Sequence, residues 1–348
     1  MFGTTNIEQI KHHVKPKPRQ KKLSTDKIKS TIVECGFLTI NHIKVSHIVK
    51  KINVLEPRFY LMLNASYLSV CEIDDYDVVV AEKNKLIKID YENKPYYFFF
   101  EFCEDIKSSK QALLILMESY KFLLKNIQLL NLSKICHANI SRLSIHLDGN
   151  CNFHPVIGDF QLSLLIDKIT KADTIFKASH YLNQLLIEIK IPSEQKYNTY
   201  PLDVYILVYI YKNSISSFSH ENVNNVLNSY LKNLESSGLQ FYCDQQRNDF
   251  HNEAYRFLMQ YIDQPAIYIV RELVQNINTW DNYSLGFEYI ILLQQISMKF
   301  QLKLSFMDGF FAVLIQTIAP NPHERGSISN TIERYNRLFN ENVEWNIN

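Results

Sequence analysis

Residues 136–163 have the sequence C-H-A-N-I-S-R-L-S-I-H-L-D-G-N-C-N-F-H-P-V-I-G-D-F-Q-L-S, and this stretch decides the expected fold. The polar triplet Asp148-Gly149-Asn150 predicts a tight turn, since these residue types accept the backbone conformations that turns require. Apolar residues precede and follow it, so we expect a short strand, the turn, and a second strand over residues 153–157. The triplet Asp159-Phe160-Gln161 follows that strand. The stretch therefore predicts a β-hairpin with polar residues at both ends.

This order of features resembles the catalytic loop and the metal-binding strand of protein kinases, where H-R-D-x-x-x-x-N is followed by a hairpin and by D-F-G. His137 matches the histidine of the first motif, and Asp159 and Phe160 match the first two residues of the second. The resemblance implies that Asp159 can bind Mg²⁺ and that His137 and Phe160 have structural roles. It also implies that His137, Asn139 and Asp159 line one cleft.

The chain departs from the kinase pattern at the positions that carry the chemistry. Ala138 replaces the arginine and Asn139 replaces the catalytic aspartate; an amide can orient a hydroxyl group but cannot accept its proton near neutral pH. Ser144 stands at the metal-binding asparagine and offers one neutral oxygen to a cation that prefers carboxylate or carbonyl oxygens. Gln161 replaces the glycine, so positive φ angles become costly there. We therefore expect that the fold is kept and that much of the activity is lost.

Two further segments resemble a pair of kinase motifs that contact each other, one at the end of the activation segment and one near the end of the domain. Residues 200–203, Y-P-L-D, stand where kinases have A-P-E, with Asp203 in place of the glutamate. Residues 321–325, N-P-H-E-R, resemble the D-P-x-x-R sequence whose arginine pairs with that glutamate. The resemblance implies a buried ion pair between Asp203 and Arg325, in which the planar guanidinium can bind both carboxylate oxygens.

Residues 280–286, W-D-N-Y-S-L-G, resemble the start of the large buried C-lobe helix of kinases. In that family the aspartate of this motif accepts hydrogen bonds from backbone N–H groups of the catalytic loop, so the resemblance assigns a structural role to Asp281. Upstream, residues 110–131 have apolar side chains at helical spacing, which predicts a long buried helix that leads into the loop.

Residues 31–105 have the position of the kinase N-lobe. Helical spacing over 40–52 is followed by β-rich runs at 60–63, 67–71, 78–81, 86–89 and 96–102, and residues 98–104 would lead into the hinge. No glycine occurs between Gly36 and Gly149, so the glycine-rich loop that covers the nucleotide phosphates in kinases is missing. Lys83 is the candidate for the ATP-binding lysine, with a solvated lysine at a strand end as the alternative.

Composition limits the class of protein. With 348 residues and a formal net charge of +1, the chain can form one large domain or two smaller ones. No apolar run reaches the roughly 18 residues needed to span a membrane, and the N-terminus lacks a hydrophobic signal core, so we expect an intracellular protein. The six scattered cysteines are typical of reduced thiols.

Residues 1–30, which include K-P-K-P-R-Q-K-K, predict a disordered basic arm.

Together these features predict an α+β protein with a bilobal, kinase-like fold. It has a basic arm (1–30), a reduced β-rich N-lobe (31–105) and a mostly helical C-lobe (106–348) that carries an extra helical insertion over about residues 204–279. The W-D-N-Y-S-L and N-P-H-E-R sequences are similar to those of divergent kinase-like proteins of large DNA viruses of eukaryotes, the giant viruses. That similarity implies the host cytoplasm or the virion as the location.

Three functions are compatible with these residues. The preferred one is a pseudokinase that binds a host or viral protein partner and transfers phosphate weakly or not at all. The first alternative is an unorthodox Ser/Thr kinase that uses ATP and Mg²⁺, in which Arg142 supplies positive charge and Glu101 or Glu104 contacts the nucleotide at the hinge. The second is a helical scaffold unrelated to kinases, whose basic arm binds nucleic acid or a partner. ATP and Mg²⁺ are cofactors only if the cleft still binds ligands.

Overall fold

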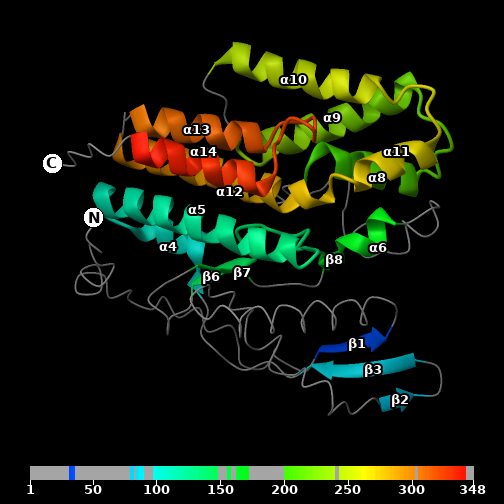
Figure 1. The fold of residues 1–348 in the computed structure, drawn as a ribbon, viewed down its shortest axis with the longest axis horizontal. Coiled ribbons are helices and arrows are strands. Elements are labelled where there is room, and N and C mark those ends of the chain that lie inside the picture. The colour runs from blue at the N-terminus through cyan, green and yellow to red at the C-terminus, as the bar shows by residue number, and fades with distance from the viewer. Residues whose placement is uncertain are drawn as a thin grey trace.

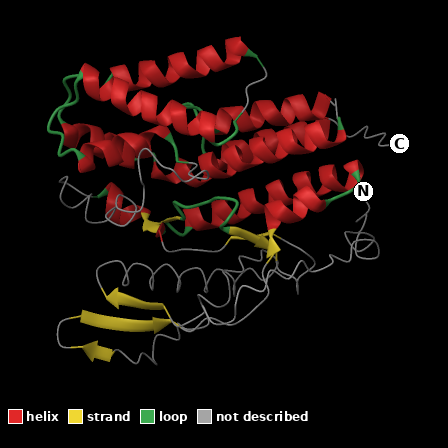
Figure 2. Ribbon diagram, turned by 180° about the vertical axis from the view of Figure 1, so that it is seen from behind, coloured by secondary structure: helices red, strands yellow, loops and turns green. Residues whose placement is uncertain are grey.

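The computed structural model describes residues 31–35, 79–81, 84–89, 97–147, 155–157, 162–171, 200–239, 243–301 and 305–341. The basic arm, the helix expected over 40–52 and the strands expected over 60–63 and 67–71 lie outside the described residues. The described part is mostly helical, and its short strands β5 to β8 lie along one side of the helices (Figures 1 and 2). None of the helices in this part is both long and apolar enough to cross a membrane.

The main helices are α4 (Phe99–Asp105), α5 (Ser109–Leu132), α6 (Ile166–Thr170), α8 (Leu202–Lys212), α9 (His220–Ser236), α10 (Asp244–Met259), α11 (Ala266–Val274), α12 (Trp280–Phe300), α13 (Ser305–Thr317) and α14 (Ile328–Glu341). A 3-10 turn, η3 (Ile277–Thr279), leads into α12. Helix α12 packs against α4, α5 and α13, and α14 packs against α5 and α13 (Figure 1). The core of the described part therefore forms around α12.

The long helix predicted over residues 110–131 is confirmed as α5. It begins after Ser108, whose side chain accepts a hydrogen bond from the Gln111 backbone N–H and so satisfies one of the free amides at the helix start. Apolar residues three and four positions apart then form one buried stripe, which includes Leu116, Leu123 and Ile127. The last turn of α5 leads directly into β5 (Ile135–Cys136), and the loop of residues 137–144 follows β5.

Helix α12 is buried on nearly all sides at its start. Every residue from Trp280 to Ile290 is buried, as expected for a helix at the centre of a core. Gly286 allows α13 to approach closely, because a Cβ atom at this position would lie 1.9 Å from Oγ1 of Thr317. This part of α12 is therefore enclosed by other segments of the chain.

The hairpin predicted within residues 136–163 is confirmed. Strand β6 (Ile145–Leu147) pairs antiparallel with β7 (Pro155–Ile157), so that Ile145 is opposite Ile157. β4 (Tyr97–Phe98) pairs with β6, and β5 pairs with β8 (Leu164–Leu165). A separate sheet contains β1 (Thr31–Cys35), β3 (Asn84–Ile89) and β2 (Val79–Ala81), in the order β1-β3-β2.

The strand predicted over residues 96–102 is wrong beyond its first residues. The strand ends at Phe98, and α4 begins at Phe99. In the helical conformation Phe99, Phe100 and Cys103 all become buried, and the two phenylalanine rings pack against Tyr289 of α12. The high β-propensity of the Tyr-Phe run is overridden because this tertiary packing buries more aromatic surface.

The segment between Asp203 and Asp281 forms helices α8 to α11, as its alternating pattern predicts. Helix α9 starts with a capping box in which Ser219 and Asn222 exchange hydrogen bonds between side chain and backbone. Helix α9 packs against α8 and α10, while α11 packs against α8 (Figure 1). Helices α8 and α9 contact the N-terminal end of α12, through Asp203 with Trp280 and through the hydroxyl groups of Tyr230 and Tyr283.

Candidate functional site

The loop between β5 and β6, residues 137–144, is held by the first carboxylate of α12. Asp281 is 1% exposed and lies directly against the loop. Its Oδ2 accepts a hydrogen bond from the His137 backbone N–H at 2.6 Å, and its Oδ1 accepts one from the Ala138 N–H at 2.8 Å. The Cys136 thiol is 3.6 Å from Oδ1. The contact that the sequence predicts between Asp281 and the loop backbone is therefore present.

This anchor holds a strained backbone. Ala138 has a φ of 58°, in the left-handed region, where the Cβ of any residue other than glycine meets steric cost. Two short hydrogen bonds to a buried carboxylate supply compensating free energy at this position, because hydrogen bonds to charged groups are the stronger ones. The positive φ at Ala138 therefore changes the course of the chain shortly after β5.

His137 has a structural position, as expected from the resemblance. Its side chain is completely buried, and its Nδ1 accepts a hydrogen bond from the Asn139 backbone N–H at 3.2 Å. The Ser163 hydroxyl donates to the carbonyl oxygen of His137 at 3.4 Å. The imidazole therefore stabilises the turn that presents Asn139, which is itself partly exposed.

The ionisation of Asp281 is affected by its surroundings. Burial raises the pKa of the Asp281 carboxyl to about 6, because the charged form loses its water. Hydrogen bonds from the backbone of His137 and Ala138 and from the Cys136 side chain oppose this rise, since they favour the carboxylate. At neutral pH the anchor is therefore mainly ionised, and it accepts hydrogen bonds from the loop.

Ser144, which stands at the metal-binding asparagine of the kinase pattern, is occupied within its own turn. Its Oγ accepts a hydrogen bond from the Ser141 N–H at 2.8 Å and donates to the Ser141 carbonyl at 3.0 Å. The side chain is 1% exposed. Within the described residues, no group of three or more His, Cys, Asp or Glu side chains could hold a metal ion. These contacts favour a role for Ser144 in closing the turn over a role as a metal ligand.

Arg142, Glu104 and a residue that the sequence analysis missed, Glu288, form a second set of contacts to the loop. Arg142 Nη1 lies 3.6 Å from Glu104 Oε1, and its Nε lies 3.6 Å from Glu288 Oε2. The guanidinium carbon is 5.6 Å from the centre of the Phe100 ring. Arg142 thus joins the loop to α4 and to α12. Glu288 stands within an apolar run of α12, and a carboxylate at such a position indicates that it has a buried partner.

The remaining candidates from the N-terminal half have other positions. Glu101 is exposed on α4, and the carbonyl oxygens of Glu104 and Ile106 accept hydrogen bonds from Lys299 Nζ. Lys299 lies in the last turn of α12, so this contact joins the end of α4 to α12. Lys83, Asp159 and Phe160 lie outside the described residues.

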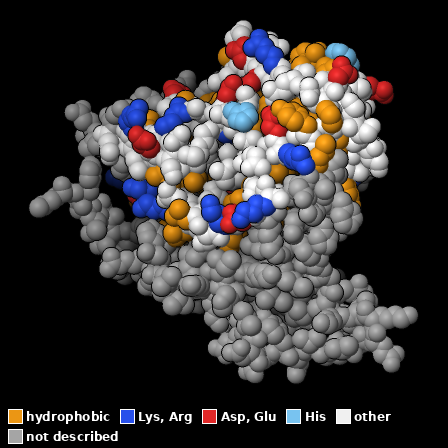
Figure 3. All heavy atoms as spheres, turned by 45° about the vertical axis from the view of Figure 1, so that its right-hand side comes forward, with side chains coloured by type: hydrophobic (Ala, Val, Ile, Leu, Met, Phe, Trp, Pro, Cys, Tyr) orange, Lys and Arg blue, Asp and Glu red, His pale blue; other side chains and the backbone are white. Residues whose placement is uncertain are grey.

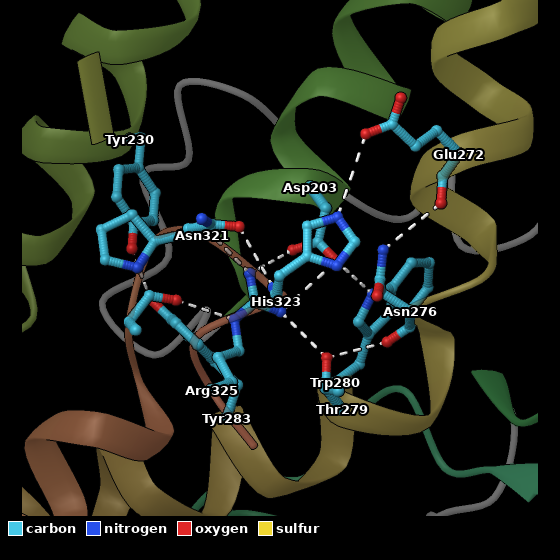
Figure 4. A network of polar contacts seen from close by, with 12 residues as sticks. Asp203, Tyr230, Glu272, Asn276, Thr279, Trp280, Tyr283, Asn321, His323 and Arg325 are labelled. Atoms are coloured by element: carbon cyan, nitrogen blue, oxygen red, sulfur yellow. Dashed lines mark hydrogen bonds and ion pairs between the residues drawn. The ribbon is translucent and has the colours of Figure 1, made fainter. Parts of the chain in front are cut away.

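A second cluster forms around Asp203 at the start of α8. Arg325 Nη2 is 2.6 Å from Asp203 Oδ1, and Nη1 is 3.4 Å from Oδ2. Both side chains are completely buried. Trp280 Nε1 donates a hydrogen bond to Asp203 Oδ2 at 2.6 Å (Figure 4). The ion pair predicted between Asp203 and Arg325 is therefore present, and Trp280 is an additional partner.

The other donors of Arg325 are also used. Its Nε donates to the Ala319 carbonyl at 2.8 Å, Nη2 donates to the Pro320 carbonyl at 3.1 Å, and Nη1 donates to Thr279 Oγ1 at 3.1 Å. The guanidinium also lies 5.1 Å from the centre of the Tyr283 ring (Figure 4). The cluster thus connects α8, η3, α12 and the segment before α14. A buried charge pair of this kind is stable only when its hydrogen-bonding groups all have partners.

The structure therefore brings the predicted residues into two groups. One group lies at the loop and consists of His137, Asn139, Arg142, Ser144 and Asp281, with Glu104 joined through Arg142. The other group is the pair of Asp203 and Arg325. Comparison of the chain with protein-family models and with curated proteins finds no match. In the part of the chain that the structure describes, fold and contacts define a mostly helical protein in which the loop of residues 137–144 is anchored to a buried central helix.

Proposed function

We propose that this chain is a degenerate protein kinase-like protein, a pseudokinase that works by binding a protein partner. The observation that carries the proposal is the pair of hydrogen bonds from the His137 and Ala138 N–H groups to Asp281, since kinases secure their catalytic loop in this way. The ion pair of Asp203 with Arg325 adds a second kinase-like contact between segments far apart in sequence. The proposal includes a bilobal fold, an extra helical insertion at about residues 204–279, and an origin in a giant virus.

The contacts at the loop argue against efficient phosphoryl transfer. Asn139 cannot serve as a general base near neutral pH. The Ser144 hydroxyl is engaged with Ser141, and the Arg142 guanidinium lies between Glu104 and Glu288. An active kinase would need these two side chains for metal binding and for charge neutralisation. The alternative of an unorthodox ATP- and Mg²⁺-dependent Ser/Thr kinase therefore loses two of its assigned groups.

The described surface gives little support to nucleic-acid binding by the folded part. On the face that Figure 3 shows, Lys and Arg side chains are mixed with Asp and Glu over the described residues. Proteins that follow a nucleic-acid backbone present a basic stripe or patch. We therefore assign any contact with nucleic acid to the basic arm, and propose a protein as the partner of the folded part.

A phosphoryl-transfer assay with radiolabelled ATP tests the proposal. The wild-type chain, with Mg²⁺ or Mn²⁺ and a generic Ser/Thr substrate, is compared with an Asp159→Ala variant. We expect equal and background incorporation in both proteins. Thermal unfolding of the wild type with millimolar ATP and Mg²⁺ adds a binding readout, because a ligand that binds only the folded state raises the melting temperature. Transfer by the wild type that Asp159→Ala abolishes would overturn the proposal in favour of an active kinase.

The kinase-like fold has its own test, which does not depend on activity. The fold requires Asp159 to lie in the same cleft as His137 and Asn139, within reach of one bound Mg²⁺. An experimental structure of the whole chain that places Asp159 there supports the bilobal arrangement. A structure in which the Asp159 carboxylate faces away from Asn139 would refute it, even though the contacts of Asp281 would remain.

A further inference from the structure

Two asparagines in the core, Asn126 on α5 and Asn282 on α12, have polar atoms that need a further partner. Both residues are completely buried. In the part of the chain that the structure describes, neither Nδ2 nor Oδ1 of Asn126 has a hydrogen-bond partner, and the same is true of Oδ1 of Asn282. Nδ2 of Asn282 donates to Oγ1 of Thr331 on α14 at 2.8 Å. Buried polar groups are nearly always hydrogen-bonded, so the three remaining atoms indicate a ligand at this place.

Helices α5 and α12 run antiparallel where they pack together (Figure 1). The Tyr289 hydroxyl of α12 donates a hydrogen bond to Oγ of Ser119 on α5 at 2.7 Å. Further along α5, Nδ2 of Asn131 donates to the carbonyl oxygen of Asn278, which precedes α12, at 2.9 Å. Positions on α5 after Ser119 are therefore opposite positions on α12 before Tyr289.

The two asparagines lie at the same level of this interface. Asn126 is seven residues after Ser119, and Asn282 is seven residues before Tyr289. Seven residues make about two helical turns, or about 10.5 Å along the axis. Each asparagine therefore lies on the same face as the hydrogen-bonded residue of its helix and at the same distance from it, so the two amides face each other between α5 and α12.

Helix α14 encloses the same place from a third direction. The Tyr335 hydroxyl donates to the carbonyl oxygen of Met117 at 2.8 Å, and Nε2 of Gln128 donates to Oγ of Ser329 at 3.2 Å. Thr331 lies between Ser329 and Tyr335 in the sequence of α14, and it is 3% exposed. The level of the two asparagines is therefore closed off by three packed helices.

The chemistry of these groups favours water as the ligand. The polar side chains that the structure places here are two amides and the Thr331 hydroxyl, all of them neutral, whereas an ion needs an opposite charge or several carbonyl oxygens. Leu123 and Ile127 next to Asn126 on α5 are completely buried and apolar. An internal space lined only by such residues stays dry, but one that also has several polar partners holds water.

We propose that a buried water molecule lies between α5, α12 and α14 and links Asn126 to Asn282. The water accepts a hydrogen bond from Nδ2 of Asn126 and donates one to Oδ1 of Asn282, so it bridges two facing groups that do not bond to each other directly. Asn282 directly follows Asp281, and the water therefore helps to fix the start of α12 that anchors the loop. This inference does not rest on the proposed function.

A crystal structure of the full chain at about 1.8 Å resolution tests the site directly. We expect an electron-density peak at about 2.7–3.2 Å from both Asn126 and Asn282, the distance of an ordinary hydrogen bond. A direct hydrogen bond between the two amides without such a peak would overturn the proposal. So would amides that turn away from each other toward other partners.

Urea unfolding of Asn126→Leu gives a second test in solution. Leucine has the same number and branching of heavy atoms as asparagine, but it cannot bind the water. Loss of the water leaves Oδ1 of Asn282 buried without a partner, so the equilibrium constant for unfolding should increase about tenfold. Unchanged or increased stability would overturn the proposal, since replacing an amide that has no partner by an apolar group is neutral or favourable.

A control and a double variant make this test specific. Asn330→Leu on α14 is the same substitution at an exposed position, and it should leave the unfolding midpoint nearly unchanged. Asn126→Leu combined with Asn282→Leu removes both ends of the bridge, and the loss of stability should be clearly smaller than the sum of the two single losses. Additive losses would mean that no shared ligand joins the two asparagines.

Discussion

Replacing Asp203 by Asn should destabilise the protein far more than an ordinary charge change at its surface. The substitution keeps the size of the side chain but removes the charge that faces Arg325 Nη1 and Nη2 and Trp280 Nε1 in a completely buried site. Removing one partner of a buried ion pair typically costs about 3–5 kcal/mol, since the other charge stays buried. Arg325 retains its bonds to the Ala319 and Pro320 carbonyls, so we expect the lower value, about 3 kcal/mol.

Urea unfolding measures this cost. With an m value near 3 kcal/mol/M, a loss of about 3 kcal/mol lowers the unfolding midpoint by about 1 M without a change in slope. The matched control is Glu333→Gln on α14, which breaks an exposed pair with Arg337 at 3.6 Å and should change stability by less than about 0.5 kcal/mol. If Asp203→Asn and Glu333→Gln shift the midpoint equally, the buried cluster does not hold these segments together.

Three other substitutions test the loop and its supporting helix by the same unfolding measurement. Asp281→Ala leaves two buried N–H groups without partners and should cost about 3 kcal/mol; a variant as stable as the parent would contradict the anchor role. Ala138→Gly relieves the positive φ and should stabilise the protein by about 0.5–1 kcal/mol, so a clear loss would argue against that backbone geometry. Gly286→Ala places a methyl group against Thr317 and should cost about 1–3 kcal/mol, whereas an unchanged midpoint would mean that α12 and α13 separate easily.

The sequence predicted those features whose signals are local or belong to a linear motif. The apolar periodicity of residues 110–131 specifies α5, and a turn triplet between two apolar segments specifies the β6–β7 hairpin. The two long-range contacts, of Asp281 with the loop and of Asp203 with Arg325, followed from the kinase-like motifs and not from periodicity. Motifs of this type indicate which distant residues contact each other, whereas composition and local pattern do not.

The features that the sequence did not predict depend on packing between distant segments. Phe99 and Phe100 belong to a run with high β-propensity, and packing of their rings against the distant Tyr289 favours the helical conformation of α4. The partner of Arg142 could not be identified for a similar reason, because Glu288 is far away in sequence and the loop has no pattern that points to it. The conformation of α4 and the partner of Arg142 therefore both depend on which distant residues are buried together.

The separation in sequence between the partners of each cluster bears on how the chain reaches its folded state. Asp203 and Arg325 are 122 residues apart, and Ala138 and Asp281 are 143 residues apart. Closing such long segments is entropically unfavourable until the intervening helices have formed, so we expect these contacts to form late in folding. Interactions that are absent from the transition state slow unfolding and leave the folding rate almost unchanged. The two buried carboxylates would then determine chiefly how long each folded molecule persists, a property that matters most where unfolded chains are degraded or aggregate.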